Sequence, residues 1–454
     1  MTSTVTRREG PRRRARFAAV TMAFFAFVGA ACGSSSSKSE SSPTTAASGG
    51  ATTAAGAATT AAASGGATTA AAAASGKTGD PIKVMTETAI DTNLTPYENI
   101  RDGSKYFAQW VNDKGGLIDG DGTAHKLEVV FCDDKYDPNE AANCARKAVS
   151  DKLVANIGGF TIDASRAIPI YEEAKVAWFG VCCPIVDQEN KSPISFPLGF
   201  VGGFPTAAAL KMNKDGCKKV ADAAGDLPVA EVFHGLFLNG WKAAGRTDEV
   251  KQIKLPLAPG DYSSQLAQLS DDTDCFFGNI GEANWPSVLT AAKKLGKKPR
   301  WYGPQGNLDA KVAKDYPAET EGSIIMGVYP DLTAKVFDDY RAALDKYKAS
   351  DKIDWNSLGG LGTWTAYVAF ADIISHMKGE ITAQTFLAAA QKTTALETKG
   401  ILPTIDLTKE WTGGGGQFPR IFNRVIYSAK ITGGKMTPLE GTVDVTKPVD
   451  GIPA

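Results

Sequence analysis

The feature that most constrains this chain is an alternation of short apolar runs and helical segments between residues 126 and 184. Three apolar runs have the length and composition of buried strands, at 127–132, 153–157 and 176–179. Small and apolar side chains recur at helical spacing in the segments between them. A strand, helix, strand, helix, strand order with short links predicts a parallel sheet with helices on its faces.

Ligands on such sheets bind at the carboxyl ends of the strands. We therefore expect a binding site in the loops that follow the second and third runs, at 158–165 and 180–184. The turn after the first run ends in Asp137 and Pro138, a good N-cap followed by a residue suited to the first helical position.

A second series of strands and helices follows a crossing rich in Pro, Gly and aromatic residues at 190–205. After a second crossing at 329–331, three helices are predicted at 335–348, 363–377 and 381–391. They are too few for a third domain, so we expect them to return to the first lobe. The predicted fold is α/β, with two doubly wound parallel-sheet lobes joined by a hinge of several crossings.

The expected division is lobe 1 at 80–200 and 331–395, lobe 2 at 201–330 and 396–440, and a tail at 441–454. We expect the Pro- and Thr-rich tail to be frayed.

Composition narrows the class of function. The chain has 454 residues, 22% of them charged, and a formal net charge of -1, which suits a two-domain soluble body and gives no argument for nucleic acid. His125, His234 and His376 lie far apart without metal-ligand neighbours at a familiar spacing, so we expect neither a metal site nor a cofactor.

The N-terminus has the pattern of an export signal. A basic head precedes an apolar stretch at 17–28 that is too short to span a bilayer, and small residues at 29–31 precede Cys32. This arrangement resembles a bacterial lipoprotein signal, although Gly29 stands where Leu is usual. It implies a signal peptide at 1–31 and a lipidated Cys32 that anchors the protein to the outer face of the cell membrane. Plain cleavage near Ala31 without a lipid is the alternative.

The segment at 32–79 consists almost entirely of Ser, Ala, Thr and Gly after Cys32. It has no apolar pattern and cannot form a packed core by itself. We expect a flexible tether between the lipid and the folded body.

Six cysteines follow Cys32, and an even number in an exported protein suggests disulfides. A bridge between Cys132 and Cys144 is plausible, because the first ends a predicted strand and the second lies in the next helix. Cys217 and Cys275 each begin an apolar run and could join neighbouring strands at their starts.

The remaining pair, Cys182 and Cys183, is adjacent in sequence. These residues could form a strained vicinal bridge or stay as thiols. A nucleophilic cysteine is the third possibility, but no histidine lies near them in the sequence.

Four stretches together carry a family resemblance. They are Asn112-Asp113-Lys114-Gly115-Gly116-Leu117, Cys132-Asp133-Asp134-Lys135-Tyr136-Asp137-Pro138, Ile157-Gly158-Gly159 and Gly303-Pro304-Gln305-Gly306. In order and spacing they resemble the type I periplasmic solute-binding proteins of ABC importers, the leucine/isoleucine/valine-binding family, over about 80–435. The resemblance implies a monomer without catalytic activity. Such a protein captures a small polar solute by closing two lobes and delivers it to a membrane permease.

The resemblance also implies which loops hold the carboxylate of the solute, through N–H and hydroxyl groups. The matching positions are Thr161, Asp163 and Ala164 in one loop, and Cys182, Cys183 and Pro184 in the other. A helix N-terminus beside Thr161 would favour an anion, whereas Asp163 opposes one unless it caps the helix at Ser165.

In the second lobe, Gln305 stands where the family often has a Glu that pairs with an ammonium group. The aromatic contact expected near Ala230 is also missing, so an amide or a related solute competes with an ordinary amino acid. Glu282 and Asn284 could supply polar contacts instead, and Tyr97 could wall the cleft. For each of these residues a turn or capping role is the alternative.

Two other classes of function stay open. A tethered ligand-sensing receptor could use the same fold, since fold does not fix function. A secreted enzyme would need a nucleophile elbow, a paired acid motif, a metal cluster or a phosphate loop, and the sequence offers none that we can place.

Overall fold

A computed structural model of the chain describes residues 76–454, apart from 93–95, 162, 182–183, 185, 227–228, 257, 309 and 351–352. The expected signal peptide, Cys32 and the tether up to residue 75 lie outside the described residues, as do Cys182 and Cys183. In the described part of the chain, every helix is too short or too polar to cross a bilayer.

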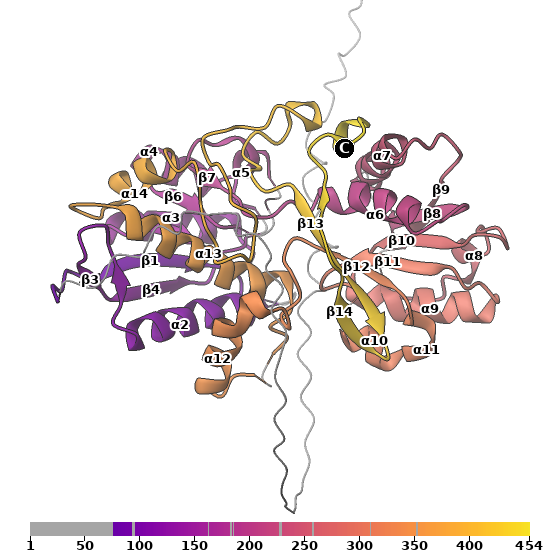
Figure 1. Cartoon of the computed structure of the whole chain (residues 1–454), viewed down its shortest axis with the longest axis horizontal. Helices are drawn as coiled ribbons and strands as arrows, with labels where there is room; N and C mark the ends of the chain where they lie inside the picture. Colours follow the sequence, from indigo (N-terminus) through magenta and orange to yellow (C-terminus); the bar gives the residue numbers. More distant parts are fainter. Residues whose placement is uncertain are drawn as a thin grey trace, which may run out of the picture.

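Two sheets lie side by side and form two lobes (Figure 1). The first sheet is parallel, with strand order β4-β1-β5-β6-β7. Its strands are β1 (Ile82–Glu87), β4 (Leu127–Cys132), β5 (Ala155–Ile157), β6 (Ala177–Phe179) and β7 (Ser195–Phe196). The accompanying helices are α2 (Glu98–Asp113), α3 (Pro138–Ser150), α4 (Ile168–Ala174) and α5 (Asp187–Lys191). A small antiparallel pair, β2 (Leu117–Ile118) and β3 (Ala124–His125), lies beside the first described residues, where the Gly79 N–H donates to the Ala124 carbonyl at 2.9 Å.

Three helices from the last third of the chain also pack on the first lobe. They are α12 (Asp338–Lys346), α13 (Leu358–His376) and α14 (Ala383–Ala390). A short 3₁₀ helix, η3 (Lys335–Phe337), precedes α12. The hydroxyl of Thr363 on α13 donates to the Gly158 carbonyl at 2.9 Å. Gly180 has a φ of +77°, and a Cβ there would lie 2.3 Å from Cβ of Ala366, so only glycine lets α13 come this close to the strand end.

The second sheet has strand order β14-β13-β12-β11-β10-β8-β9, and β15 pairs with β13 beside this path. It is parallel from β9 to β12 and antiparallel at β13 and β14. The strands are β8 (Val220–Gly225), β9 (Lys251–Leu255), β10 (Cys275–Asn279), β11 (Arg300–Pro304), β12 (Ile324–Gly327), β13 (Val425–Thr432), β14 (Lys435–Pro438) and β15 (Val443–Asp444). The helices are α6 (Gly203–Lys214), α7 (Val229–Ala243), α8 (Ser263–Leu266), α9 (Trp285–Lys294), α10 (Ala310–Asp315) and α11 (Pro317–Thr320).

The chain passes between the lobes after β7, after β12 and before β13. We expected all of 396–440 in the second lobe, but the bonds of this range are divided. The Leu407 N–H donates to the Thr393 carbonyl at 2.9 Å, and Nε of Arg420 donates to the Ser195 carbonyl of β7, also at 2.9 Å. Only from β13 onward does the range belong to the second sheet.

The expectation of a frayed tail is wrong. Strand β15 pairs with β13, and the short helix η5 (Pro448–Asp450) packs against α7. Val445 and Val449 are buried, because these apolar side chains find room in the core beside α6 and α7.

Both predicted disulfides are present. Cys132–Cys144 joins the end of β4 to α3, and Cys217–Cys275 joins the segment just before β8 to the start of β10.

Candidate functional site

The acidic turn after β4 organises the carboxyl edge of the first sheet. Asp133 accepts hydrogen bonds from the N–H groups of Ile90 and Asp91, both at 2.9 Å, so it ties the end of β4 to the loop after β1. Asp137 caps α3 by accepting from the Asn139 N–H at 2.7 Å, as predicted. Only the middle carboxylate, that of Asp134, turns into the protein, where it is fully buried.

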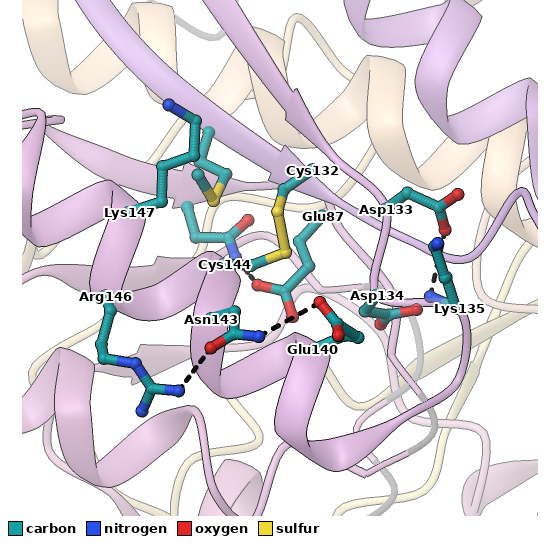
Figure 2. Close-up of a disulfide and its surroundings, with 12 residues drawn as sticks. Glu87, Cys132, Asp133, Asp134, Lys135, Glu140, Asn143, Cys144, Arg146 and Lys147 are labelled. Atoms are coloured by element: carbon teal, nitrogen blue, oxygen red, sulfur yellow. Dashed lines mark hydrogen bonds between the residues drawn. A yellow bond between two sulfur atoms is a disulfide. The ribbon is translucent and has the colours of Figure 1, made fainter.

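Asp134 shares this interior with Glu87, the last residue of β1 (Figure 2). The Asp134 carboxylate accepts from the Tyr136 N–H at 3.0 Å, and burial raises its pKa to about 6. Glu87 Oε2 accepts from Asn156 Nδ2 at 3.0 Å and from the Tyr171 hydroxyl at 3.1 Å. Burial, and then the neighbouring charge of Asp134, raise the pKa of Glu87 well above its usual range.

Three buried side-chain oxygen atoms at this edge have no partner within the described part of the chain: Glu87 Oε1, Thr88 Oγ1 and Asp134 Oδ2. Buried polar atoms in native proteins are almost always hydrogen-bonded, to water or to a ligand where protein groups do not serve. The carboxyl edge of the first sheet therefore has oxygen atoms available for hydrogen bonds to water or to a ligand.

The first-lobe candidates gather at this edge. Thr161 is 2% exposed, and Ala164, three residues further along the chain, is fully buried. The Tyr97 ring packs edge-on against Phe160, with 4.8 Å between ring centroids.

Asp163 does not cap helix α4, because the N-cap residue of that helix is Ala167 and it has no side-chain cap; Asp163 instead closes the turn before the helix. Its carboxylate accepts from the Ser165 N–H at 2.9 Å. The helix α4 itself begins only at Ile168, so the helix N-terminus that we expected beside Thr161 is displaced along the chain. In the second loop Pro184 is buried, while Cys182 and Cys183 lie outside the described residues.

In the second lobe, Gln305 directly follows β11, and its N–H donates to the Met326 carbonyl at 2.7 Å. Its Oε1 is buried and has no partner within the described part of the chain, and the same holds for the Tyr329 hydroxyl. Both residues line a cavity at the crossing after β12, together with Asp331. The space open to the centre of a water molecule there is about 10 Å³, which suits one water. Gln305 thus keeps an acceptor free at a crossing between the lobes.

Asn284 is engaged within the second lobe. Its Nδ2 donates to the Tyr262 hydroxyl at 2.5 Å, and that hydroxyl shares its proton between the carbonyls of Pro256 and Ala258. This is a structural role of the kind that we stated as the alternative. Glu282 begins the short helix η2 (Glu282–Asn284), and its side chain is not among those that the structure describes.

Sequence reasoning missed the group of Glu87, Asp134, Asn156 and Tyr171. One signal was available, because Glu87 is a charged residue at the end of an otherwise buried strand. Asp134 was part of a recognised motif, but its inward direction depends on Lys135 and Tyr136, which take left-handed φ values of 52° and 60°.

Comparison with known proteins places this geometry in a family. The sequence profile of the family described as periplasmic binding protein matches residues 95–419. The Leu/Ile/Val-binding protein of Escherichia coli K12 is 22% identical over 303 residues, which are 65% of this chain and 78% of that protein.

Solved structures agree in fold. A possible leucine/isoleucine/valine-binding protein from Rhodopirellula baltica has a TM-score of 0.62 at 15% identity, covering 82% of this chain and 98% of that one. A fatty acid ABC transporter substrate-binding protein from Thermomonospora curvata has a TM-score of 0.58 at 17% identity, covering 82% and 94%. The two-lobed α/β fold and the span of the profile confirm the expected fold class and family: the chain belongs to the periplasmic binding proteins of type I.

Proposed function

We propose that the protein captures a small polar solute, an amino acid, an amide or a related molecule, between its two lobes and delivers it to an ABC importer. The family is one of extracytoplasmic solute-binding proteins. The observation that supports a site between the lobes is a set of buried oxygen atoms without a partner in the described part of the chain, three at the carboxyl edge of the first sheet and Gln305 Oε1 in the second lobe. Ligands of open α/β sheets bind at such edges, where a few polar groups converge.

The identity of the solute has to be inferred from the residues of this chain. The Escherichia coli relative is named for leucine, isoleucine and valine, and the Thermomonospora curvata neighbour for a fatty acid. These names describe solutes of different polarity. Gln305, neutral and buried with a free oxygen, favours a solute that brings a hydrogen-bond donor to the second lobe.

A thermal-shift screen of amino acids, amides, amines and organic acids tests solute capture. A ligand present at a hundred times its dissociation constant stabilises the native state by about 2.7 kcal/mol, a shift that such a screen detects. The variant Gln305→Met keeps the shape and removes the free oxygen, and we expect it to bind the identified solute roughly tenfold more weakly.

The control is Gln268→Met, the same change at an exposed position of the second lobe. It should bind as the unaltered protein does. A flat response to the whole library would contradict solute capture, and unchanged affinity in Gln305→Met would remove Gln305 from the site.

Delivery is measured separately, as uptake of the labelled solute by cells with and without the chain. Loss of uptake without the chain supports the importer role. Normal uptake by cells that lack it would favour a tethered ligand-sensing receptor instead.

A further inference from the structure

The C-terminal tail, residues 443–450, is fixed to the second lobe. Its strand β15 pairs with β13 of the second sheet, and its short helix η5 packs against α7 beside the C-terminus (Figure 1). Nδ2 of Asn239 on α7 donates to the Val449 carbonyl at 2.7 Å, and the side chains of Val445 and Val449 are buried. The tail therefore moves with the second lobe.

The segment from Trp411 to Arg420, just before the last crossing, is held from the other side. The Arg420 guanidinium donates to the Ser195 carbonyl of β7 at 2.9 Å. The rings of Trp411 and Phe418 pack against the ring of Phe200, which follows β7, with 5.6 and 5.1 Å between centroids. This segment therefore moves with the first lobe.

The last crossing, residues 421–424, joins these two pieces, and the tail joins them a second time. The Asp450 carboxylate at the end of η5 accepts from the Gly414 N–H, with its two oxygen atoms at 2.9 and 3.1 Å from the nitrogen. Gly414 lies in a loop of four glycines, 413–416, and has a φ of +64°. A Cβ on Gly413 would lie 2.8 Å from Asp450 Oδ2, so glycine at this position lets the carboxylate approach the loop.

The tail also contacts the crossing itself. The Val445 N–H donates to the Arg424 carbonyl at 2.9 Å, and Arg424 Nε donates to the Thr446 hydroxyl at 3.0 Å. The Arg424 guanidinium lies over the ring of Trp411, 5.4 Å from its centroid. Arg424 thus connects the tail with the segment that the first lobe holds.

We propose that the tail is a brace across the last crossing, in which Asp450 of the second lobe binds the glycine loop on the side of the first lobe and restricts the rotation of the two lobes. When two lobes close on a hinge, a few residues in the crossings absorb the change in φ and ψ. A bond between the two sides of a crossing has to stretch or break during this rotation, so it opposes the rotation. The inference rests on the proposed function, in which the lobes move relative to each other.

The bond from Gly414 to Asp450 is the part of the brace that can be removed without disturbing the core. Asp450 is exposed, whereas Val445 and Val449 are buried. The charge of a carboxylate strengthens the hydrogen bond that it accepts from an N–H group. Asp450→Ala should therefore loosen the brace and leave η5 packed on α7.

Hydrogen exchange of the full-length protein tests the bond. We expect the Gly414 N–H to exchange roughly tenfold faster in Asp450→Ala than in the unaltered protein, because a charge-assisted hydrogen bond has been removed. Asp450→Asn keeps one acceptor oxygen and should give an intermediate rate. Mass spectrometry with fragmentation of the labelled peptides measures the rate at this residue.

The distance between the lobes tests the brace. Single-molecule energy transfer is measured without solute, between dyes on non-canonical amino acids at two exposed positions, Lys105 of α2 and Lys298 after α9. In Asp450→Ala we expect the ratio of the less populated to the more populated lobe arrangement to rise roughly tenfold, with a broader distribution of distances. The control is Asp315→Ala, which removes an exposed aspartate at the end of α10 and should leave the distribution unchanged.

Faster exchange at Gly414 with an unchanged distance distribution in Asp450→Ala would overturn the brace, because Asp450 would then only order the glycine loop. Unchanged exchange at Gly414, or equal broadening in Asp315→Ala, would overturn it as well. No solute takes part in these measurements, so they are independent of the solute screen. Failure of the brace leaves solute capture intact, and a flat screen beside a functioning brace contradicts solute capture alone.

Discussion

A buried carboxyl group without a full set of partners lowers stability whenever it is ionised. Asp134 is such a group, because burial raises its pKa from 3.8 to about 6. Between these two values the native state holds a proton that the unfolded chain has released. The free energy of unfolding therefore falls as the pH rises through this interval, by about 3 kcal/mol if Asp134 acts alone.

Asp134→Asn should remove this penalty. At pH 7.5 we expect the variant to exceed the unaltered protein in free energy of unfolding by about 1–3 kcal/mol, and at pH 4 the two should be nearly equal. Urea denaturation at both pH values, followed by tryptophan fluorescence, measures the difference. Asp137→Asn, which removes the same charge from the exposed cap of α3, is the matched control. A gain of equal size at both pH values would show that the titration of Asp134 is not the cause.

At the element level, the two disulfides close loops of different length. Cys132 and Cys144 are separated by 12 residues, and Cys217 and Cys275 by 58. A longer loop loses more entropy in the unfolded chain when it is closed, so the second bridge should stabilise the protein more.

Replacing Cys132 and Cys144 by alanine should lower the free energy of unfolding by about 3 kcal/mol, and replacing Cys217 and Cys275 by about 4 kcal/mol. Chemical denaturation of the two double variants gives both values, and the unaltered protein under reducing conditions is the control. The reverse order would mean that native-state strain, and not chain entropy, decides how much each bridge contributes.

Elements that the sequence predicted well are those in which the local pattern and the tertiary environment agree. The run at 127–132 coincides with β4, and Asp137 and Pro138 begin α3 as expected. Strands of two to four residues, such as β7, β14 and β15, are too short to produce an alternation that stands out from a loop.

Helix α13 shows how packing overrides propensity. We expected it to start at 363, but the preceding sequence Leu-Gly-Gly-Leu-Gly, which has a low helix propensity, is also helical. It begins at Leu358, because Ser357 caps it and tertiary contacts need small residues there. A Cβ on Gly359 would lie 3.0 Å from Asn99 Oδ1, and one on Gly360 would lie 2.7 Å from the Trp355 carbonyl oxygen.

The candidate site was predictable only in outline. Loop positions such as Thr161 and Gln305 follow from the ends of strands. The ends of strands do not reveal which polar atoms remain without a partner. That depends on contacts between segments far apart in sequence, such as those of Glu87 with Asn156 and Tyr171.

For the molecule as a whole, Arg420 holds the last crossing against the first lobe. Its guanidinium bonds to the Ser195 carbonyl at 2.9 Å and to Glu410 at 3.1 Å, and lies over the rings of Phe196 and Phe422 at 4.8 and 4.7 Å. Burial of the group lowers its pKa from the usual value.

Arg420→Met should lower the free energy of unfolding by about 2–4 kcal/mol, since it leaves the Ser195 carbonyl without its donor and removes two ring contacts. Arg300→Met is the control, because Arg300 is half exposed and its ion pair with Asp215 is long, at 3.8 Å. This change should alter the free energy of unfolding by less than about 1 kcal/mol. Thermal and urea unfolding of both variants provide the comparison. An equal effect of the two changes would show that the last crossing is not held by Arg420.

The mode of attachment is also a property of the whole molecule. If a lipid on Cys32 anchors the protein, Cys32→Ser should move it from the membrane fraction to the soluble fraction of expressing cells. Fractionation followed by immunoblotting measures this, and a His-tagged membrane protein serves as the fractionation control. Continued membrane association of Cys32→Ser would contradict the lipid anchor.

The order of the elements along the chain determines when each lobe can fold during synthesis. The first lobe is incomplete until α13 and α14 have been made, and these helices follow β12 of the second lobe in sequence. The second sheet is incomplete until β13 (Val425–Thr432) has been made. A nascent chain that has not yet reached residue 425 has therefore finished neither half. Such a chain cannot complete either lobe until nearly all of it has been made, so we expect both lobes to reach their native fold only when synthesis is nearly finished.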